Sequence, residues 1–152
     1  MSTTVNTFFW FDNQAEQAAA FYTSVVPESR IVDTTRTPDG AVFTVQLELA
    51  GHALTLLNGG PGHEFTDAAS IQVVVDTQAE IDRLWAALTE GGEPGPCGWL
   101  TDKYGVSWQV APADLPKLMA ATDPARLAAL TTALRGMSKI DVQALRDAYD
   151  RA

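Results

Sequence analysis

Residues 11–16 read FDNQAE and residues 75–80 read VDTQAE, so one pattern returns after 64 positions (75 minus 11). Residues 51–56 (GHALTL) likewise parallel residues 105–110 (GVSWQV), now at an offset of 54 (105 minus 51), so the second copy is shorter by a loop. Each copy has roughly 50 residues, too few to bury a full core alone. The sequence therefore predicts a duplicated chain whose modules share a core or pair with another chain.

Composition excludes several classes of protein. The chain has 152 residues, 46% hydrophobic and 19% charged, as expected for a globular protein of one domain or of two half-domains around one site. A net charge of −9 argues against nucleic acid as a partner, because a phosphate backbone would be repelled. The single cysteine, Cys97, excludes an internal disulfide, and no apolar run has membrane-spanning length. We expect a cytoplasmic protein without a membrane partner.

The first module is predicted over residues 4–60 as βαβββ. An aromatic strand over residues 6–11 precedes a helix that Asp12 or Asn13 can cap and that Pro27 ends. Strands are predicted over residues 29–35, 41–49 and 53–58, with turns at 38–40 and 50–52.

The second module, over residues 68–112, repeats this order with one weakened strand. A strand over 70–75 leads through an N-cap at Thr77, or at Asp76, into a helix over 78–90. Residues 93–98 are too rich in glycine and proline for a regular edge strand, whereas 99–102 and 107–110 can pair.

The tail, residues 113–152, reads as a helical extension of the 1–112 domain. Short helices are expected over 113–120, 125–137 after an N-cap at Asp123, and 138–151. Their apolar stripes predict core contacts and consist of Leu127, Leu130, Leu134, Ile140, Leu145 and Tyr149.

Several segments together are similar to one family. Residues 10–12 (WFD), 57–60 (LNGG), 95–100 (GPCGWL) and 102–109 (DKYGVSWQ) resemble the PhnB-like branch of the vicinal oxygen chelate superfamily, the glyoxalase/bleomycin-resistance/dioxygenase proteins. The resemblance implies an α+β fold of two βαβββ modules whose curled mixed sheets surround a common cavity, plus C-terminal helices, usually in a homodimer. Whether the modules pair within one chain or across the dimer stays open.

Relatives of this kind are often labelled 3-demethylubiquinone-9 3-methyltransferases. No glycine-rich turn follows a leading strand here, so nothing in the sequence indicates a site for a nucleotide-like methyl donor. Methyltransferase activity is not expected.

The resemblance also implies positions for metal ligands, because the superfamily's metal enzymes place His or Glu on the first and last strand of each module. These positions fall on Asn6 or Thr7, Thr55, Ser70 and Gln109. None is His or Glu, and neutral hydroxyls and amides are weak ligands for a transition metal. We therefore expect neither a metal nor another cofactor.

Strand alternation predicts which side chains line the cavity. Ile71, Val73 and Val75 are expected to face the helices, which leaves Gln72 and its neighbours on the cavity side. The expected ligand-binding residues, after transfer to the first module and addition of nearby polar and aromatic side chains, are Asn6, Phe8, Trp10, Thr55, Asn58, Phe65, Ser70, Gln72, Trp99 and Gln109. Alternatively, the tryptophans simply fill the interior.

Catalytic residues cannot be assigned from this pattern. His63, Glu64 and Cys97 are weak candidates, because the histidine lacks a second ligand and no neighbouring cation would activate the thiol. Three functions follow in order: a metal-independent small-molecule binding protein, a lyase or isomerase with a non-standard site, and a structural dimer. Ligand and pathway are not encoded in a recognisable motif.

Overall fold

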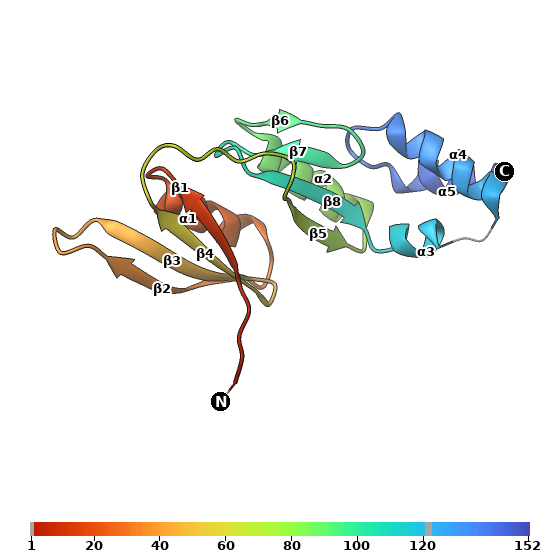
Figure 1. The fold of residues 1–152 in the computed structure, drawn as a ribbon. Coiled ribbons are helices and arrows are strands. Elements are labelled where there is room, and N and C mark those ends of the chain that lie inside the picture. The colour runs from red at the N-terminus through yellow and green to blue at the C-terminus, as the bar shows by residue number, and fades with distance from the viewer. Residues whose placement is uncertain (1, 121–122) are drawn as a thin grey trace. The chain divides into compact units, whose positions relative to one another are not determined.

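The computed structural model describes residues 2–120 and 123–152, which form two compact units, one up to Glu64 and one from Phe65 on. Each unit packs one helix on a four-stranded mixed sheet, and the second also carries the C-terminal helices (Figure 1). The predicted α+β class with C-terminal helices is confirmed. No helix among the described residues is long and apolar enough to cross a membrane.

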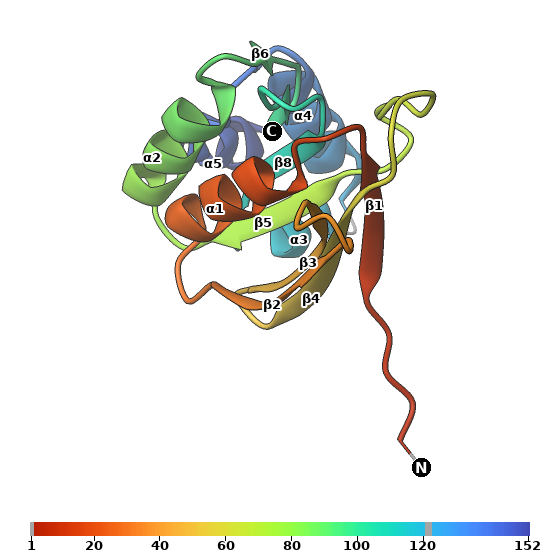
Figure 2. The same ribbon diagram turned by 90° about the vertical axis from the view of Figure 1, so that its left-hand side faces the viewer.

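The first unit contains strands β1 (Thr7–Phe11), β2 (Arg30–Arg36), β3 (Val42–Leu49) and β4 (His52–Asn58) and helix α1 (Ala15–Val25). The strand order is β1-β4-β3-β2, so β1 lies at one edge, parallel to β4 (Figure 2). Alternate residues of β3 and β4 are buried beneath the alanine-rich face of α1. This core consists of Ala15, Ala18, Ala19, Tyr22, Val45, Leu47, Leu54 and Leu56.

The second unit repeats this plan with β5 (Ile71–Val75), α2 (Gln78–Thr89), β6 (Glu93–Pro94), β7 (Trp99–Thr101) and β8 (Ser107–Pro112). The strand order is β5-β8-β7-β6, again with the first strand parallel to the last. The expected weakening of residues 93–98 is confirmed, because only two of these residues pair as β6.

The pairing register confirms the duplication. Phe8 lies opposite Thr55 in the first unit, and Gln72 lies opposite Gln109 in the second. The offsets are 64 (72 minus 8) and 54 (109 minus 55), the same as those of the repeated sequence patterns. The helices begin only 63 positions apart (78 minus 15), so the turn before α1 holds one extra residue.

This extra residue changes how α1 is capped. The prediction of Asp12 and Asp76 as caps was wrong, whereas that of Thr77 is confirmed: its Oγ1 accepts a hydrogen bond from the Glu80 backbone at 3.2 Å. At α1, the amide oxygen of Asn58 on β4 accepts a hydrogen bond from the Ala15 backbone at 2.8 Å. A side chain that is distant in sequence therefore satisfies a helix-end donor, which local pattern reading cannot detect.

The tail forms α3 (Leu115–Met119), α4 (Pro124–Arg135) and α5 (Val142–Arg151). The predicted core contacts of its stripes are confirmed for Leu130, Ile140 and Leu145, which form a buried cluster. The predicted N-cap at Asp123 is also confirmed, because its side chain accepts a hydrogen bond from the Ala125 backbone.

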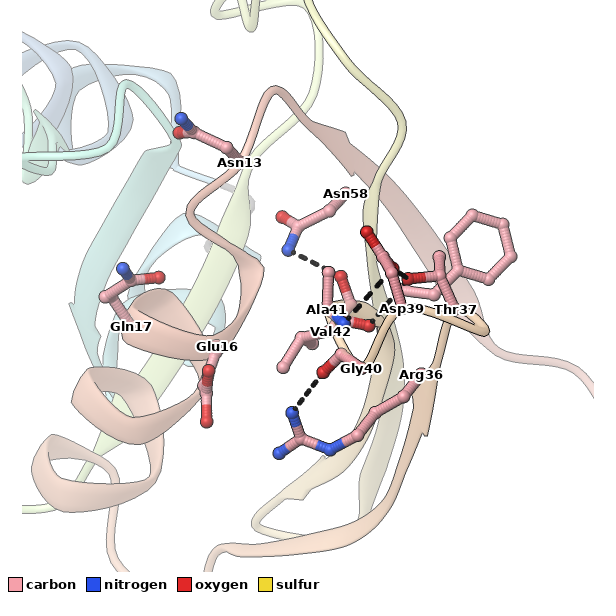
Figure 3. A pocket seen from close by; sticks show the side chains of 11 residues that line it. Asn13, Glu16, Gln17, Arg36, Thr37, Asp39, Gly40, Ala41, Val42 and Asn58 are labelled. Atoms are coloured by element: carbon pink, nitrogen blue, oxygen red, sulfur yellow. Dashed lines mark hydrogen bonds between the residues drawn. The ribbon is translucent and has the colours of Figure 1, made fainter.

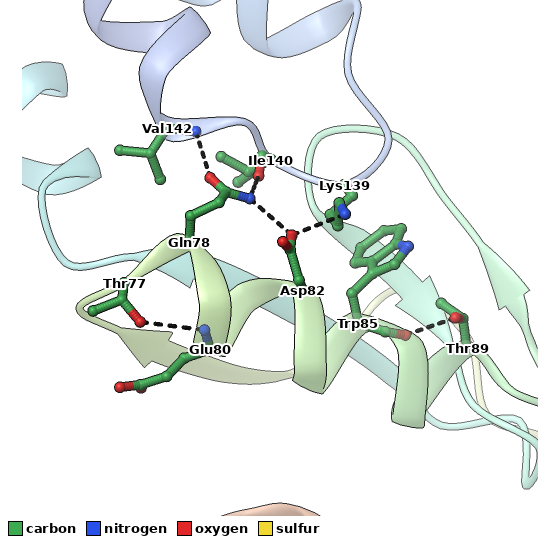
Figure 4. Close-up of polar contacts among 9 residues, drawn as sticks. All are labelled: Thr77, Gln78, Glu80, Asp82, Trp85, Thr89, Lys139, Ile140 and Val142. Carbon is green, nitrogen blue, oxygen red and sulfur yellow. Dashed lines mark hydrogen bonds and ion pairs between the residues drawn. The ribbon is translucent and has the colours of Figure 1, made fainter.

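The link between α4 and α5 is attached to α2 through Gln78 (Figure 4). The Gln78 amide nitrogen donates to the Ile140 carbonyl, and its oxygen accepts from the Val142 backbone, both at 2.9 Å. Lys139 adds an ion pair with Asp82 at 2.8 Å. One side chain of α2 thus forms hydrogen bonds with two backbone groups of the tail.

Candidate ligand-binding faces

Each sheet has one face toward its helix and one away from it, here called the open face. On β1, Phe8 is 57% exposed and Trp10 39%, whereas Phe11 is 3% exposed. On β5, Gln72 and Val74 are exposed and Val75 is buried. The predicted alternation is therefore confirmed in both units, because successive side chains of a strand point to opposite faces.

Trp10 is held in one orientation by the loop that follows β4. Its indole nitrogen donates a hydrogen bond to the Gly60 carbonyl at 2.9 Å. A Cβ atom at Gly59 would lie 2.2 Å from the indole ring, so only glycine leaves room for it. His63 contacts the ring edge-on with centroids 4.7 Å apart. The open face of the first unit therefore presents a fixed, partly exposed aromatic surface.

The four positions that the resemblance implied for metal ligands form one hydrogen-bonded pair in each unit. Thr55 donates to the amide oxygen of Asn6 at 3.1 Å, and Gln109 donates to the hydroxyl of Ser70 at 2.9 Å. The register makes these pairs equivalent. Thr7, the alternative first position, is hydrogen-bonded to His52 at 3.0 Å.

The donor chemistry of these pairs does not fit a transition-metal centre. Each pair consists of hydroxyl and amide groups that already use one another as partners, and neither contains an anionic oxygen or an imidazole. Within residues 2–120 and 123–152, no three His, Cys, Asp or Glu side chains gather closely enough to hold a metal ion.

The open face of the second unit combines amides with an aromatic wall. Gln72 donates to the Gln109 side chain at 3.4 Å, and Trp99 lies opposite Gln109 on the neighbouring strand. Trp99 and Cys97 line a cavity of about 550 Å³ together with the acidic residues Asp67 and Glu93. The Cys97 backbone has a positive φ of 59° and donates to the Met137 carbonyl at 2.8 Å, which fixes its position.

Three other predicted site residues lie elsewhere. Asn58 is on the helix side of its sheet, where its amide also donates to the Val42 carbonyl at 3.2 Å. Phe65 is half-buried, and Glu64 is exposed in the loop after His63. The structure brings Trp10 and His63 together, and separately Ser70, Gln72, Trp99 and Gln109.

Asp102 is a residue that the site prediction missed. It is 3% exposed, and its carboxylate accepts hydrogen bonds from the backbone of Tyr104 and Val106 and from the indole of Trp108 at 2.8 to 3.1 Å. Burial, with the adjacent Asp102 charge, raises the pKa of the Tyr104 phenol above 10.0. The DKYGVSW pattern already contained this arrangement, in which an aspartate shapes the turn that ends in a buried tryptophan.

Two βαβββ units with open sheet faces define a protein of the vicinal oxygen chelate superfamily. The model of the 3-demethylubiquinone-9 3-methyltransferase family matches residues 3–111, and the chain belongs to this PhnB-like family. No curated protein sequence matches the chain.

Solved structures share the fold, and one of them is similar enough in sequence to support the family assignment. The PhnB protein from Bacillus cereus is 32% identical with a TM-score of 0.66, and the match covers 73% of this chain and 100% of that one. A protein from Pseudomonas aeruginosa is 21% identical (TM-score 0.62; 73% and 98% covered). The fosfomycin resistance protein FosX from Mesorhizobium loti, 13% identical with a TM-score of 0.58, covers 80% of this chain and 99% of its own and shares the fold.

Proposed function

We propose that the protein binds a small molecule reversibly on its open sheet faces without a metal ion. The observation that carries this proposal is the pairing of Asn6 with Thr55 and of Ser70 with Gln109. Neutral groups that satisfy one another take the positions where a metal enzyme of this superfamily needs anionic or imidazole ligands.

The chemistry of the faces favours a flat, partly aromatic or carbonyl-bearing ligand. In the first unit Trp10 offers a flat apolar surface, and in the second unit Trp99 offers another, with the amides of Gln72 and Gln109 as donors and acceptors on the same sheet. Apolar walls with few polar groups are typical of reversible small-molecule sites.

Methyl transfer, despite the family's name, finds little support in the turns that follow the leading strands. β1 leads into α1 through Asp12, Asn13 and Gln14, and β5 leads into α2 through Asp76 and Thr77. Neither turn contains the glycines that let a backbone approach a nucleotide-like donor.

A lyase or isomerase is the second candidate, because Cys97 and two carboxylates line the same cavity as Trp99. It predicts that a bound compound is converted and that Cys97→Ser abolishes the conversion. The binding proposal predicts that the compound is recovered unchanged. A purely structural dimer, the third possibility, predicts that no compound binds.

Native mass spectrometry of the purified protein, together with elemental analysis, tests the proposal. We expect no stoichiometric divalent metal and a co-purified or added aromatic compound at one equivalent. One equivalent of zinc, nickel, manganese or iron that is lost when Thr55 or Gln109 is replaced would contradict metal independence.

The variant Gln72→Leu separates a binding face from a packed interior. Because the Gln72 side chain is exposed, its loss should leave the melting temperature nearly unchanged and weaken ligand binding. The control Val73→Ala shortens the helix-facing side chain next to it and should lower stability by about 1 kcal/mol. If Gln72→Leu lowered stability by about 1 kcal/mol while Val73→Ala had no effect, the assignment of Gln72 to the open face would be contradicted.

A further inference from the structure

A second cavity lies on the helix side of the first unit, away from its open face. Its volume is about 690 Å³, within the range of small-molecule sites. Figure 3 shows its two walls, the first turn of α1 on one side and the hairpin between β2 and β3 on the other. Nothing in the proposed function uses this cavity.

The cavity has a cation on its hairpin wall and an anion on its helix wall that do not pair with each other, and the hairpin wall also carries the Asp39 carboxylate, which accepts a hydrogen bond from the Thr37 hydroxyl. Arg36 reaches from the hairpin toward α1, with one guanidinium nitrogen fixed by the Gly40 carbonyl at 2.9 Å (Figure 3). Glu16 stands on the first turn of α1. Neither side chain forms an ion pair with any residue that the structure describes, so both charges remain available to a ligand.

The hairpin wall is preorganised by its own hydrogen bonds. Thr37 donates its backbone N–H to the Ala41 carbonyl, and Gly40 donates to the Thr37 carbonyl, both at 2.9 Å. Asp39 accepts from the Thr37 hydroxyl, which holds the pKa of the Asp39 carboxyl below 3.8. A fixed wall lowers the ordering cost of binding.

The remaining lining suits a peptide bond and an apolar side chain. Asn13 and Gln17 contribute primary amides from the helix side, and Phe43, 44% exposed, contributes an aromatic surface. We propose that this cavity binds a short zwitterionic peptide, with its ammonium group toward Glu16 and its carboxylate toward Arg36. The amides of Asn13 and Gln17 then form hydrogen bonds with the peptide bond of the ligand, and Phe43 packs against its apolar side chain.

Three ligands of nearly equal shape test the charge requirement. Glycyl-phenylalanine carries both charges, its N-acetyl derivative lacks the ammonium, and its C-terminal amide lacks the carboxylate. By calorimetry and amide chemical-shift perturbation, we expect each neutralised ligand to bind roughly 1.4- to fivefold more weakly, because partly exposed ion pairs contribute about 0.2 to 1 kcal/mol. The shifts should include Gly40 and Ala41 of the hairpin.

Two variants assign each charge to its wall. Glu16→Gln should remove the preference for the free ammonium and keep the preference for the carboxylate, and Arg36→Gln should do the reverse. Glu90→Gln and Lys117→Gln change exposed charges outside the cavity and should leave both preferences intact. All four variants should keep the melting temperature, since the substituted side chains are exposed.

The peptide site and the open face are distinguishable. Trp10→Leu should leave glycyl-phenylalanine binding unchanged, and Glu16→Gln should leave binding to the open face unchanged. Equal affinity for all three ligands, absence of binding by glycyl-phenylalanine, or shifts confined to residues outside the hairpin and α1 would each overturn the peptide site.

Discussion

At the scale of single residues, two close contacts determine what the chain presents to a ligand. Gly59 allows the Trp10 indole to lie against the backbone, and Gly60 accepts its N–H, so the ring is fixed on the open face. Asp102 instead organises the interior beside β8, where three donors converge on one carboxylate.

We predict that Gly59→Ala displaces the Trp10 ring and destabilises the first unit by about 1 to 3 kcal/mol, the usual cost of overpacking. The added Cβ would lie 2.2 Å from the indole. Tryptophan fluorescence and thermal melting measure the change. Gly136→Ala is the control, because its Cβ would come no closer than 3.5 Å to the Ala133 carbonyl and 3.8 Å to the Thr132 carbonyl, which are ordinary contacts. Equal behaviour of the two variants would refute the contact.

We predict that Asp102→Ala destabilises the second unit by about 3 kcal/mol or more, because it leaves buried donors without a partner. Asp102→Asn should cost less, since an amide oxygen can still accept from the Tyr104 and Val106 backbones but the amide nitrogen cannot accept from Trp108. Chemical denaturation measures both variants. A stability unchanged in Asp102→Ala would contradict this role.

At the scale of elements, the tail completes the core of the second unit. Gly98 leads into β7 at a place where a Cβ would lie 2.7 Å from the Ile140 side chain, so Ile140 fills the space that a larger residue would need. The backbones of Cys97 and Gly98 donate to the carbonyls of Met137 and Ser138, both at 2.8 Å. The link between α4 and α5 is therefore connected to the segment before β7 by both packing and hydrogen bonds.

We predict that Gln78→Leu loosens the tail and costs about 1 to 3 kcal/mol, because the Ile140 carbonyl and the Val142 N–H lose their partner. Hydrogen exchange of residues 138–151 should become faster than in the parent protein. Gln143→Leu is the matched control, since Gln143 is exposed and its side chain donates to Asp147 on its own helix. Identical exchange in both variants would exclude the proposed attachment.

The Asp82–Lys139 pair predicts an acid dependence of the same attachment. The hydrogen bond from Lys139, then that from Gln78, holds the pKa of Asp82 below its ordinary 3.8. Because the pKa of Asp82 is lower in the folded protein than in the unfolded chain, the ionised carboxylate stabilises the fold above pH 3.8. This contribution is lost as the pH falls through the folded-state pKa. Melting temperatures of the parent and Asp82→Asn should therefore differ near neutral pH and converge in acid, and a difference that persists at low pH would contradict this origin.

At the scale of the whole molecule, exposed apolar side chains on the strands of the first unit favour self-association. Phe8, Trp10, Ile31 and Val32 are each between 39% and 57% exposed. Large exposed apolar side chains are typical of surfaces that another chain covers, and here they lie on the two edge strands of the sheet, β1 and β2.

We therefore predict a homodimer, with light scattering giving twice the chain mass of 16.3 kDa. Ile31→Lys combined with Val32→Glu should shift the equilibrium toward the monomer, because charge on a sheet edge opposes its burial. A monomer at micromolar concentration for the parent protein would refute the prediction.

The sequence by itself determined the duplication, the βαβββ order, the α+β class and the faces of β1 and β5. These features follow from the periodicity of apolar residues and from repeated local patterns. The repeats are visible in the sequence as pairs of similar segments 64 and 54 positions apart. Even the weak sixth strand was visible, because glycine and proline are poor strand formers whatever their surroundings.

Only the tertiary structure decided which polar side chains already have hydrogen-bonding partners within the protein. The cap of α1 by Asn58, the attachment of the tail by Gln78 and the pairing of Asn6 with Thr55 join residues 43 to 64 positions apart. The cavity that holds Glu16 and Arg36 on opposite walls arises in the same way. A hydrogen bond depends on distance and direction in space, which the order of residues along the chain does not specify until the sheet brings them together.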